Sequence, residues 1–477
     1  MTARLGSGVA RLDSVLDGGL PRDAITLVIG LPGSGKTILA QQCAFANGTA
    51  ERPALYLSTV SEPLEKILRY GQTLAFFDAG AVGTRVVYED LGGVLGDKGL
   101  GGLLTLVRDL LRTHRPGVIV VDSFKALYPY ARGSGEFRRF LHDLAGMLSA
   151  YPVTSLWVGE YGEDEVAVAP EFAVADAIIA LGTSRTAERE SRGLRVLKLR
   201  GGGYRSGRHA YRISAGGIAV FPRLADPGAD RAAGSDGPGL DTGDRGLDGD
   251  RVSTGIGALD DLLADGYRPG AATLVAGPTG VGKTIMGLHF VFGGAARGEP
   301  GVVAAFQEYP SRLERTARAF GWSFADAGVT LLHRGPIDLY LDEWVHDLLE
   351  TAEATGARRV LVDGLGDLRD ASLDAVRFRE CTYSLVHRLS RRGVGLMMTY
   401  EVPELFGLSR LPEHDASQVS DNVVLLGYQN TNGTIARTIT VLKTRAGHHD
   451  PRVQEFQITA GGVRLTQCGE GWPPGRG

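Results

Sequence analysis

The sequence predicts an α/β protein made of two tandem domains, each a mostly parallel β-sheet flanked by helices. The main observation is a glycine-rich pattern, G-x-x-x-x-G-K-[ST], that occurs twice, at residues 30–37 and 277–284. Each copy follows a short apolar run typical of a buried strand and precedes residues with helical periodicity. Apolar runs that alternate with helical patterns indicate parallel sheets, because parallel strands need helical crossovers. The 477 residues are enough for two separate hydrophobic cores.

The two glycine-rich loops have the composition of an anion-binding site. Glycines let successive backbone N–H groups point toward an anion, and the following helix adds the positive end of its dipole. In such loops the lysine reaches the β- and γ-phosphates of a nucleotide, and the threonine hydroxyl holds Mg²⁺. An ordinary surface turn is the alternative, but it does not explain two copies in the same strand-loop-helix context. The residues expected to bind ATP are Gly30, Gly33, Ser34, Gly35, Lys36, Thr37, Gly277, Gly280, Val281, Gly282, Lys283 and Thr284.

Composition argues against several classes of protein. The net charge of −4 does not favour a surface dominated by contacts to nucleic-acid phosphates. No run of 18 or more apolar residues predicts a transmembrane helix, and the first residues lack the apolar core of a signal peptide. The three cysteines, Cys43, Cys381 and Cys468, form no paired motif, which favours free thiols in a reducing compartment. We therefore expect a cytoplasmic protein with no membrane segment, for which DNA is not the expected partner.

An internal repeat predicts the domain boundaries. Residues 4–13 align with residues 251–260, 247 positions later, and the two glycine-rich loops are separated by the same 247 positions. Between the copies, residues 225–250 are rich in Gly, Asp and Pro and almost lack large apolar residues, so they cannot bury enough surface to become ordered. The expected parts are domain one at 1–224, a flexible linker at 225–250, domain two at 251–468 and a tail at 469–477.

The strands expected after each loop follow the order of a nucleotide-binding α/β fold. Two of them, at 118–122 and 360–363, are apolar until they end in Asp122 and Asp363. Polar residues at the carboxyl ends of parallel strands lie at the ligand-binding edge of the sheet. The two aspartates are therefore expected to hold Mg²⁺ together with Thr37 and Thr284. The other strands are expected at 54–59, 154–158 and 177–181 in domain one, before and after a helix at 64–70, and at 395–399 and 423–426 in domain two.

Each domain closes with a strand that carries a K-x-R triplet. Lys198 and Arg200 lie in residues 194–201, and the same triplet recurs in residues 440–447. Together with the loop and the aspartate, present twice, these closing strands resemble the tandem KaiC-type ATPases of the RecA superfamily. The resemblance covers nearly the whole chain apart from the linker and the tail. It implies two tandem RecA-like P-loop NTPase domains.

The resemblance also implies a ring of subunits, most commonly six, with ATP at each subunit interface. In such rings the cations of the K-x-R triplet reach the phosphates bound by the neighbouring subunit, where positive charge stabilises the transferred phosphoryl group. Residues two apart on a strand point the same way, as this role requires. The alternative is a solvated strand face that carries two cations. The residues concerned are Lys198, Arg200, Lys443 and Arg445.

The catalytic acid departs from the family's pattern. KaiC-type domains often carry two adjacent glutamates after the second strand, and the first is credited with orienting water. This chain has Ser61-Glu62 and Gln307-Glu308 instead. A hydroxyl or an amide can position water but cannot take a proton at neutral pH. Glu62 and Glu308 are therefore expected to act in a slow hydrolysis, although Glu62 also suits a helix start, where a carboxylate favours the dipole.

Two functional classes remain in contention. The first is a ring ATPase whose nucleotide state switches its binding to a regulatory protein. Autokinase activity on Ser417 is an open possibility in this class, although Gln418 stands where clock members have a second acceptor. The second is a DNA-dependent ATPase of the recombinase or helicase type. For that class residues 201–209 are the only basic, aromatic-bearing segment, and they are short. The sequence favours the switch ATPase.

Overall fold

The structure is a computed structural model of the 477-residue chain. It divides the chain into two compact units, Met1–Arg223 and Leu224–Gly477, here called domain one and domain two. Of the linker expected at 225–250 only Asp250 is described, and the tail expected at 469–477 lies outside the described residues. The residues that the structure describes are 3–60, 62–162, 165–166, 168–186, 189–224, 250–335, 337, 339–372, 374–403, 416–431, 433–445 and 447–466.

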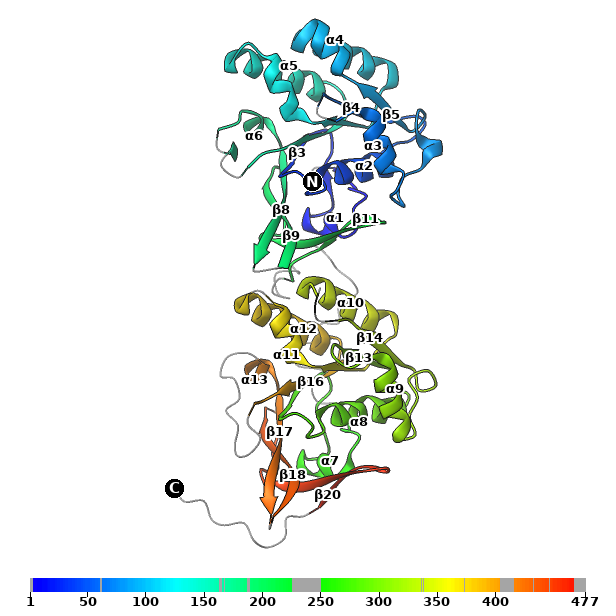
Figure 1. The fold of residues 1–477 in the computed structure, drawn as a ribbon, viewed down its shortest axis with the longest axis vertical. Helices are drawn as coiled ribbons and strands as arrows, with labels where there is room; N and C mark the ends of the chain where they lie inside the picture. Colours follow the sequence, from blue (N-terminus) through cyan, green and yellow to red (C-terminus); the bar gives the residue numbers. More distant parts are fainter. Residues whose placement is uncertain are drawn as a thin grey trace. The chain divides into compact units, whose positions relative to one another are not determined.

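Domain one is built on a nine-stranded sheet (Figure 1). The strands from β8 through β3 to β5 run parallel, whereas β8–β9, β9–β10 and β10–β11 are antiparallel pairs. The strand that leads into the first glycine-rich loop, β3, therefore lies between two parallel neighbours. The spatial order is β11 (Gly217–Phe221), β10 (His209–Ser214), β9 (Arg189–Leu199), β8 (Ala177–Thr186), β3 (Ile25–Gly30), β7 (Thr154–Gly159), β6 (Val118–Asp122), β4 (Ala54–Ser58) and β5 (Val86–Asp90).

Domain two repeats this sheet strand for strand, which confirms the predicted fold class of two tandem, mostly parallel sheets. Its strand β12 leads into the second glycine-rich loop and lies between the parallel strands β16 and β17. The spatial order is β20 (Gly462–Thr466), β19 (Gln454–Thr459), β18 (Thr434–Thr444), β17 (Asn422–Thr431), β12 (Ala272–Gly277), β16 (Gly395–Glu401), β15 (Arg359–Asp363), β13 (Gly301–Ala305) and β14 (Val329–His333).

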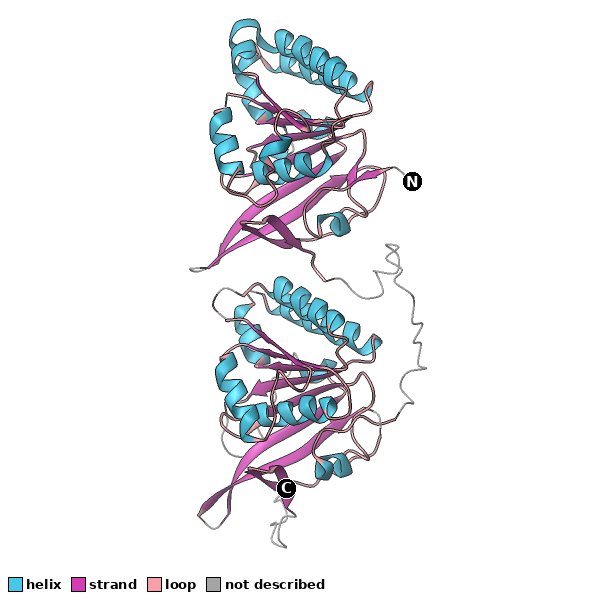
Figure 2. Cartoon of the chain, turned by 90° about the vertical axis from the view of Figure 1, so that its right-hand side faces the viewer, coloured by secondary structure: helices cyan, strands magenta, loops and turns pink. Residues whose placement is uncertain are grey.

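Helices lie on both sides of the sheet in each domain taken by itself (Figure 2). A short antiparallel pair, β1 (Arg4–Leu5) and β2 (Leu20–Pro21), stands apart from the large sheet of domain one. The helices of domain one are α1 (Leu12–Val15), α2 (Lys36–Asn47), α3 (Leu64–Gly71), α4 (Gly92–His114), α5 (Ser134–Ser149) and α6 (Glu171–Val174), with 3₁₀ turns at Ala79–Ala81 and Phe124–Tyr130. Those of domain two are α7 (Gly257–Leu262), α8 (Lys283–Ala295), α9 (Pro310–Ala319), α10 (Leu341–Ala354), α11 (Leu365–Ala371), α12 (Ala375–Arg391) and α13 (Ala416–Val419).

Alternate residues of the central strand explain the packing of domain one on two faces. Ile25, Leu27 and Ile29 of β3 belong to a core formed with α4 and α5. Val28 belongs to a second core, formed with α1 and α2. Successive side chains of a strand point to opposite faces, so a strand covered on both faces is apolar at nearly every position. For this reason the parallel strands are recognisable in the sequence as uninterrupted apolar runs.

Two strands are longer than the sequence predicts. The apolar pattern ends at residues 181 and 426, but β8 extends to Thr186 and β17 extends to Thr431. The added residues pair with β9 and β18 in long hairpins. Most of them are half-buried or exposed, so the apolar alternation stops while the backbone hydrogen bonds continue.

Candidate nucleotide-binding sites

The two glycine-rich loops have the curled backbone of an anion-binding nest. In the loop between β3 and α2, Gly33 has a φ of 77° and Gly35 a φ of 91°. Gly280 and Gly282 repeat these left-handed values in domain two, at 72° and 115°. Residues with a side chain rarely adopt this region. At Gly30 space is also limiting, because a Cβ would lie 2.1 Å from a carbonyl oxygen of β8. Such loops direct backbone N–H groups toward an anion.

The lysine of each loop folds back over its own loop. Lys36 Nζ donates a hydrogen bond to the carbonyl oxygen of Leu31 at 3.0 Å, and Lys283 Nζ donates to that of Pro278 at 2.8 Å. Lys283 Nζ also lies 3.8 Å from a carboxylate oxygen of Glu401. Burial lowers the pKa of both amines, because the charged form loses its water. Because burial disfavours an uncompensated positive charge, a phosphate bound in the loop would stabilise the protonated amine.

The aspartate at the end of β6 is held by two hydroxyl groups. Thr37 Oγ1 donates to Asp122 Oδ2 at 2.8 Å, and the Tyr56 hydroxyl donates to the same oxygen at 2.6 Å. Burial raises the pKa of Asp122, while the two hydrogen bonds and the charge of Lys36 act in the opposite direction. The structure thus places Lys36, Thr37 and Asp122, from two different elements, around one point at the edge of the sheet.

Asp363, the equivalent aspartate of domain two, is hydrogen-bonded by a hydroxyl from the neighbouring strand on its other side. Thr399 Oγ1 donates to Asp363 Oδ1 at 2.6 Å, and Thr284 also hydrogen-bonds this carboxylate. Thr399 lies on β16, whereas Tyr56 lies on β4, and these strands flank their aspartates from opposite sides. The sequence analysis missed both residues. The signal it could have used is a hydroxyl side chain within an otherwise apolar strand that neighbours the aspartate.

The oxygen atoms at these two points are of the kind that Mg²⁺ prefers. A threonine hydroxyl and a carboxylate are hard ligands, and Mg²⁺ usually completes its shell with waters and substrate phosphates. Within the described part of the chain, no group of three or more His, Cys, Asp or Glu side chains could hold a metal by itself. The two sites therefore fit Mg²⁺ that is bound together with nucleotide phosphates.

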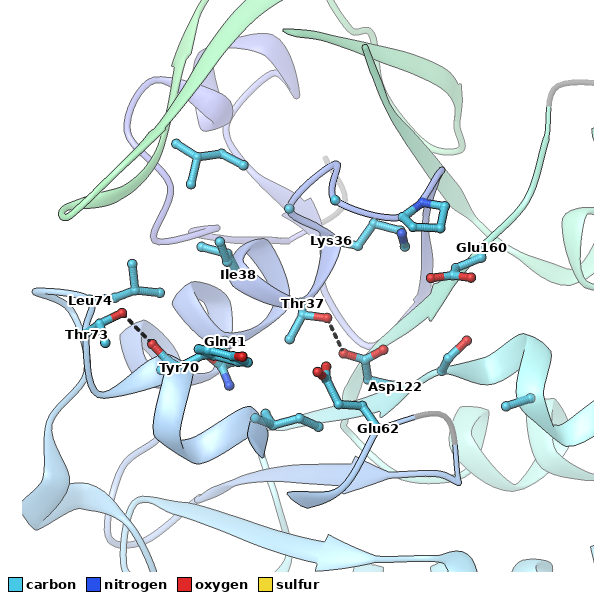
Figure 3. Close-up of a pocket in the computed structure, with 18 of the residues that line it drawn as sticks. Lys36, Thr37, Ile38, Gln41, Glu62, Tyr70, Thr73, Leu74, Asp122 and Glu160 are labelled. Carbon is cyan, nitrogen blue, oxygen red and sulfur yellow. Dashed lines mark hydrogen bonds between the residues drawn. The ribbon is translucent and has the colours of Figure 1, made fainter. Parts of the chain in front are cut away.

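A cavity of about 760 Å³ opens over the loop of domain one (Figure 3). This volume is in the range of small-molecule sites, which measure about 300–1,000 Å³. Its lining contains charged groups, which suit the phosphates of a nucleotide, and apolar groups, which suit its base. The charged residues of the lining are Lys36, Glu62, Asp122, Lys125 and Glu160, and its apolar residues include Ile38, Ile67, Leu74 and Ile213.

The K-x-R cations of domain one bind carbonyl groups of their own chain. Lys198 Nζ donates to the carbonyl oxygens of Phe172 at 3.0 Å and Ala173 at 3.2 Å. Arg200 donates to the Ala173 oxygen at 3.3 Å and lies 3.4 Å from a carboxylate oxygen of Asp176. Neither cation is among the described residues that line the cavity of domain one. In the structure the two cations thus contact the segment before β8 and not the cavity over the phosphate loop.

Domain two repeats this arrangement. Lys443 Nζ donates to the carbonyl oxygens of Ser417 and Ser420, each at 2.9 Å, and Arg445 donates to that of Gln418. In domain one the acceptor carbonyls lie on helix α6, which precedes β8, the partner of the triplet's strand β9. In domain two they lie on or next to helix α13, which precedes β17, the partner of β18.

Comparison with known proteins agrees with this geometry. The model of a family described as "ATPase: KaiC" matches residues 5–225 and, a second time, residues 252–470. The chain belongs to the KaiC family of ATPases. The resemblance drawn from the sequence is thereby confirmed, in both domains.

Curated KaiC relatives match this chain over nearly its whole length. Circadian clock protein KaiC3 of Synechocystis sp. is 28% identical over 484 residues, covering 97% of this chain and 91% of the relative. The circadian clock oscillator proteins KaiC of Picosynechococcus sp. and Prochlorococcus marinus are 26% and 27% identical, covering 95% and 97% of this chain and 88% and 92% of the relatives. These matches do not favour the DNA-dependent class. Within the described residues, no helix is long and apolar enough to cross a membrane.

The two glutamates of this KaiC-family chain do not occupy equivalent positions, contrary to the pairing expected from the sequence. Strands β4 and β13 begin 247 positions apart, and so do Pro63 and Pro310 at the starts of the following helices. Glu62 therefore corresponds to Tyr309, and Glu308 corresponds to the residue before Glu62. The sequence analysis matched Glu62 to Glu308 because both are glutamates. Counting residues from the start of the preceding strand gives the structural equivalence.

Both glutamates nevertheless lie near the aspartate of their own site. Figure 3 shows the carboxylate of Glu62 beside Asp122, and Glu62 also forms an ion pair of 2.9 Å with Lys66 on α3. In domain two, burial and the negative charge of Asp363 raise the pKa of Glu308. Each site thus has one carboxylate close to its Mg²⁺-type ligands. Ser61 lies outside the described residues.

Replacement of Tyr56 by phenylalanine is expected to destabilise domain one at neutral pH. The change removes a hydrogen-bond donor from the buried carboxylate oxygen of Asp122, and such a loss costs about 1–3 kcal/mol. The donor stabilises the ionised form, so its contribution is present above the pKa of Asp122 in the folded protein and is lost as the pH falls through that pKa. Urea unfolding across a pH series measures both the loss and its disappearance in acid.

Tyr88→Phe is the matched control. Tyr88 lies on the neighbouring strand β5, with its ring centroid 5.0 Å from that of Tyr56. Its buried hydroxyl has no hydrogen-bond partner among the described residues, so removing it is expected to leave the stability unchanged or to raise it. Equal losses in the two variants would contradict the role assigned to Tyr56.

Proposed function

We propose that the chain is a homo-oligomeric ring ATPase that binds Mg²⁺·ATP in both domains, hydrolyses it slowly and uses its nucleotide state to switch binding to a regulatory protein. The observation that carries the proposal is the complete set of binding groups in each domain. Each has a loop lysine, which is buried in domain one and half-buried in domain two. Each also has a threonine that is hydrogen-bonded to the aspartate, Thr37 to Asp122 and Thr284 to Asp363. Membership of the KaiC family supports the ATPase activity.

In this proposal the residues of each site divide the work. The loop N–H groups and the lysine bind the phosphates, while the threonine and the aspartate hold Mg²⁺. When bound, Mg²⁺ neutralises charge on the β- and γ-phosphates. Glu62 in domain one, and Glu308 in domain two, orient the attacking water and accept its proton at a carboxylate oxygen. The raised pKa of Glu308 makes this carboxylate a better proton acceptor than an exposed glutamate.

The cations of the K-x-R triplets act on the neighbouring subunit in this proposal. Two observations support it: Lys198 and Arg200 do not line the cavity of domain one, and Arg200 and Arg445 keep more than half of their side-chain surface exposed. An exposed guanidinium can leave a carbonyl partner for the phosphates across an interface, where it stabilises the transition-state charge. By the family resemblance the ring has six subunits.

Mixed rings test this role of Arg200. Lys36→Ala chains keep Arg200 but lose the loop lysine, and Arg200→Ala chains keep the loop. In a mixture, intact sites form wherever the two kinds of subunit meet in the right order. The expected result is an ATPase rate above the mean of the two separate variants. The control mixes Lys36→Ala with the double variant Lys36→Ala/Arg200→Ala, which restores no site. Sedimentation as a monomer at saturating ATP, or no gain in the mixture, would contradict action in trans.

The switch and the autokinase activity are tested on the same full-length chain. A regulatory partner is expected to be captured from a lysate of the source cells in one nucleotide state, ATP or ADP, and released in the other; equal capture in both would overturn the switch.

Ser417 on α13 is the proposed phosphate acceptor, because it lies in the segment held by Lys443. After incubation with Mg²⁺·ATP, mass spectrometry should find phosphate on Ser417 and none in the Ser417→Ala variant. Phosphate elsewhere or nowhere would remove Ser417 from the proposal.

A further inference from the structure

The phosphate loop of domain one is anchored from behind by strand β10. Tyr211 of this strand is fully buried, and its hydroxyl donates a hydrogen bond of 2.7 Å to the carbonyl oxygen of Ser34. One residue earlier in the loop, Arg192 of β9 donates to the carbonyl oxygen of Gly33 at 2.8 Å. Two consecutive loop carbonyls are thus held by side chains of the antiparallel part of the sheet.

This anchoring determines where the loop's N–H groups point. The Ser34 carbonyl and the Gly35 N–H belong to one planar, trans peptide unit, in which C=O and N–H point in opposite directions. A hydrogen bond that holds the carbonyl toward Tyr211 therefore holds the Gly35 N–H toward the opposite side of the loop. Gly35 is also the N-cap residue of α2, and the N-terminus of a helix is where an anion binds.

Domain two has the same packing without the donor. In domain one Gly35 packs against Ile213 of β10, whose Cδ1 would lie 2.7 Å from a Cβ added to the glycine. In domain two Gly282 packs in the same way against Ile458 of β19, at 2.8 Å. Two residues before these isoleucines stand Tyr211 and Phe456, respectively. Phe456 is buried like Tyr211 but has no hydroxyl.

The contact that domain two does make is weaker and lies elsewhere in the loop. The hydroxyl of Tyr428, on β17, donates to the carbonyl oxygen of Thr279 at 3.3 Å, a long and exposed hydrogen bond. Thr279 lies two residues before Val281, which takes the place of Ser34. The part of the second loop next to the helix N-terminus is therefore held by packing against β19, with no hydroxyl from the position of Tyr211.

We propose that Tyr211 is a positioning residue that preorganises the phosphate loop of domain one for nucleotide, through a contact that domain two, with Phe456 in this place, lacks. The inference rests on the proposed binding of nucleotide at both loops. A loop already held in its bound geometry loses less conformational freedom on binding, which increases affinity.

Single-site chains separate the two affinities. The full chain with Lys283→Ala reports on domain one, and the full chain with Lys36→Ala reports on domain two, each titrated with a fluorescent ADP in the presence of Mg²⁺. Tyr211→Phe in the first background is expected to weaken binding about 3- to 10-fold, the worth of one hydrogen bond, and to speed nucleotide release. Tyr211→Phe in the second background is the crossed control and should leave domain two unchanged.

Phe456→Tyr is the decisive reciprocal change. Its hydroxyl would stand where Tyr211 has one and could donate to the Val281 carbonyl, so domain two is expected to bind about 3- to 10-fold more tightly. A side chain that only fills space would produce no such gain. The inference is overturned if Tyr211→Phe binds nucleotide with the parental affinity, or if Phe456→Tyr does not increase the nucleotide affinity of domain two. If Tyr211→Phe does not fold, the result with Phe456→Tyr decides alone. Absence of nucleotide binding in both single-site chains overturns the proposed function itself.

Discussion

Lys36→Ala is expected to leave the purified chain with one bound nucleotide in place of two, held in domain two. The Lys36 amine is buried within its own loop, with its charge close to the place that the loop geometry gives to the phosphates. Removing it leaves the phosphate charge without its partner in a poorly hydrated site, where such pairing is strongest. Lys283→Ala is expected to do the same to domain two, because each loop contains its own lysine.

The measurement is the amount of nucleotide released by acid per chain, after gel filtration in Mg²⁺·ATP. Lys98→Ala is the control, since Lys98 is an exposed lysine on α4 of the same domain, and it should retain two nucleotides. Loss of both nucleotides in Lys36→Ala would contradict two independent sites.

Glu62→Gln and Glu308→Gln together are expected to abolish most ATP hydrolysis while leaving nucleotide binding intact. Loss of a general base typically costs a factor of about 10²–10⁴ at one site. Because the two sites contribute separately to the total, each single variant should lose only about half of the turnover. The amide keeps the size of the side chain but cannot accept a proton at neutral pH.

The pH profile of the Glu62→Gln variant tests the role of Glu308. In the Glu62→Gln variant the remaining activity depends on Glu308, whose pKa is raised by burial and by Asp363. A base works only when deprotonated, so this activity should decline as the pH falls through that raised pKa, at a higher pH than for an exposed glutamate. Glu65→Gln, an exposed glutamate on α3, is the control and should keep the parental rate. If the double variant hydrolyses ATP at the parental rate, the two glutamates are not the catalytic acids, and Ser61 and Gln307 become the candidates.

The parts of the sites that lie within one strand-loop-helix unit could be predicted from the sequence. Lys36 and Thr37 follow their glycines directly, and Asp122 ends an apolar run, so a short stretch of chain contains the whole signal. Tyr56 and Tyr211 could not be found in this way. Each meets its partner across the sheet, 66 and 177 positions away along the chain, and no local pattern encodes that contact.

The glutamates show a different limit of sequence analysis. Glu62 and Glu308 each follow a strand and precede a helix, and residue type alone matched them to each other. The offset of 247 positions between the repeats reveals the shift of one position, and the strand starts and the prolines at the helix starts agree with it. A loop between two regular elements carries no periodicity of its own, so its internal alignment depends on the elements at its ends.

The opposite support of the two aspartates restricts how the halves of this duplicated protein can be recombined. A chimaera that exchanged only β4 and β13 would take the Tyr56 hydroxyl from Asp122 and bring it to Asp363, which already has Thr399 on β16. Although the halves share one strand order, they are not interchangeable parts.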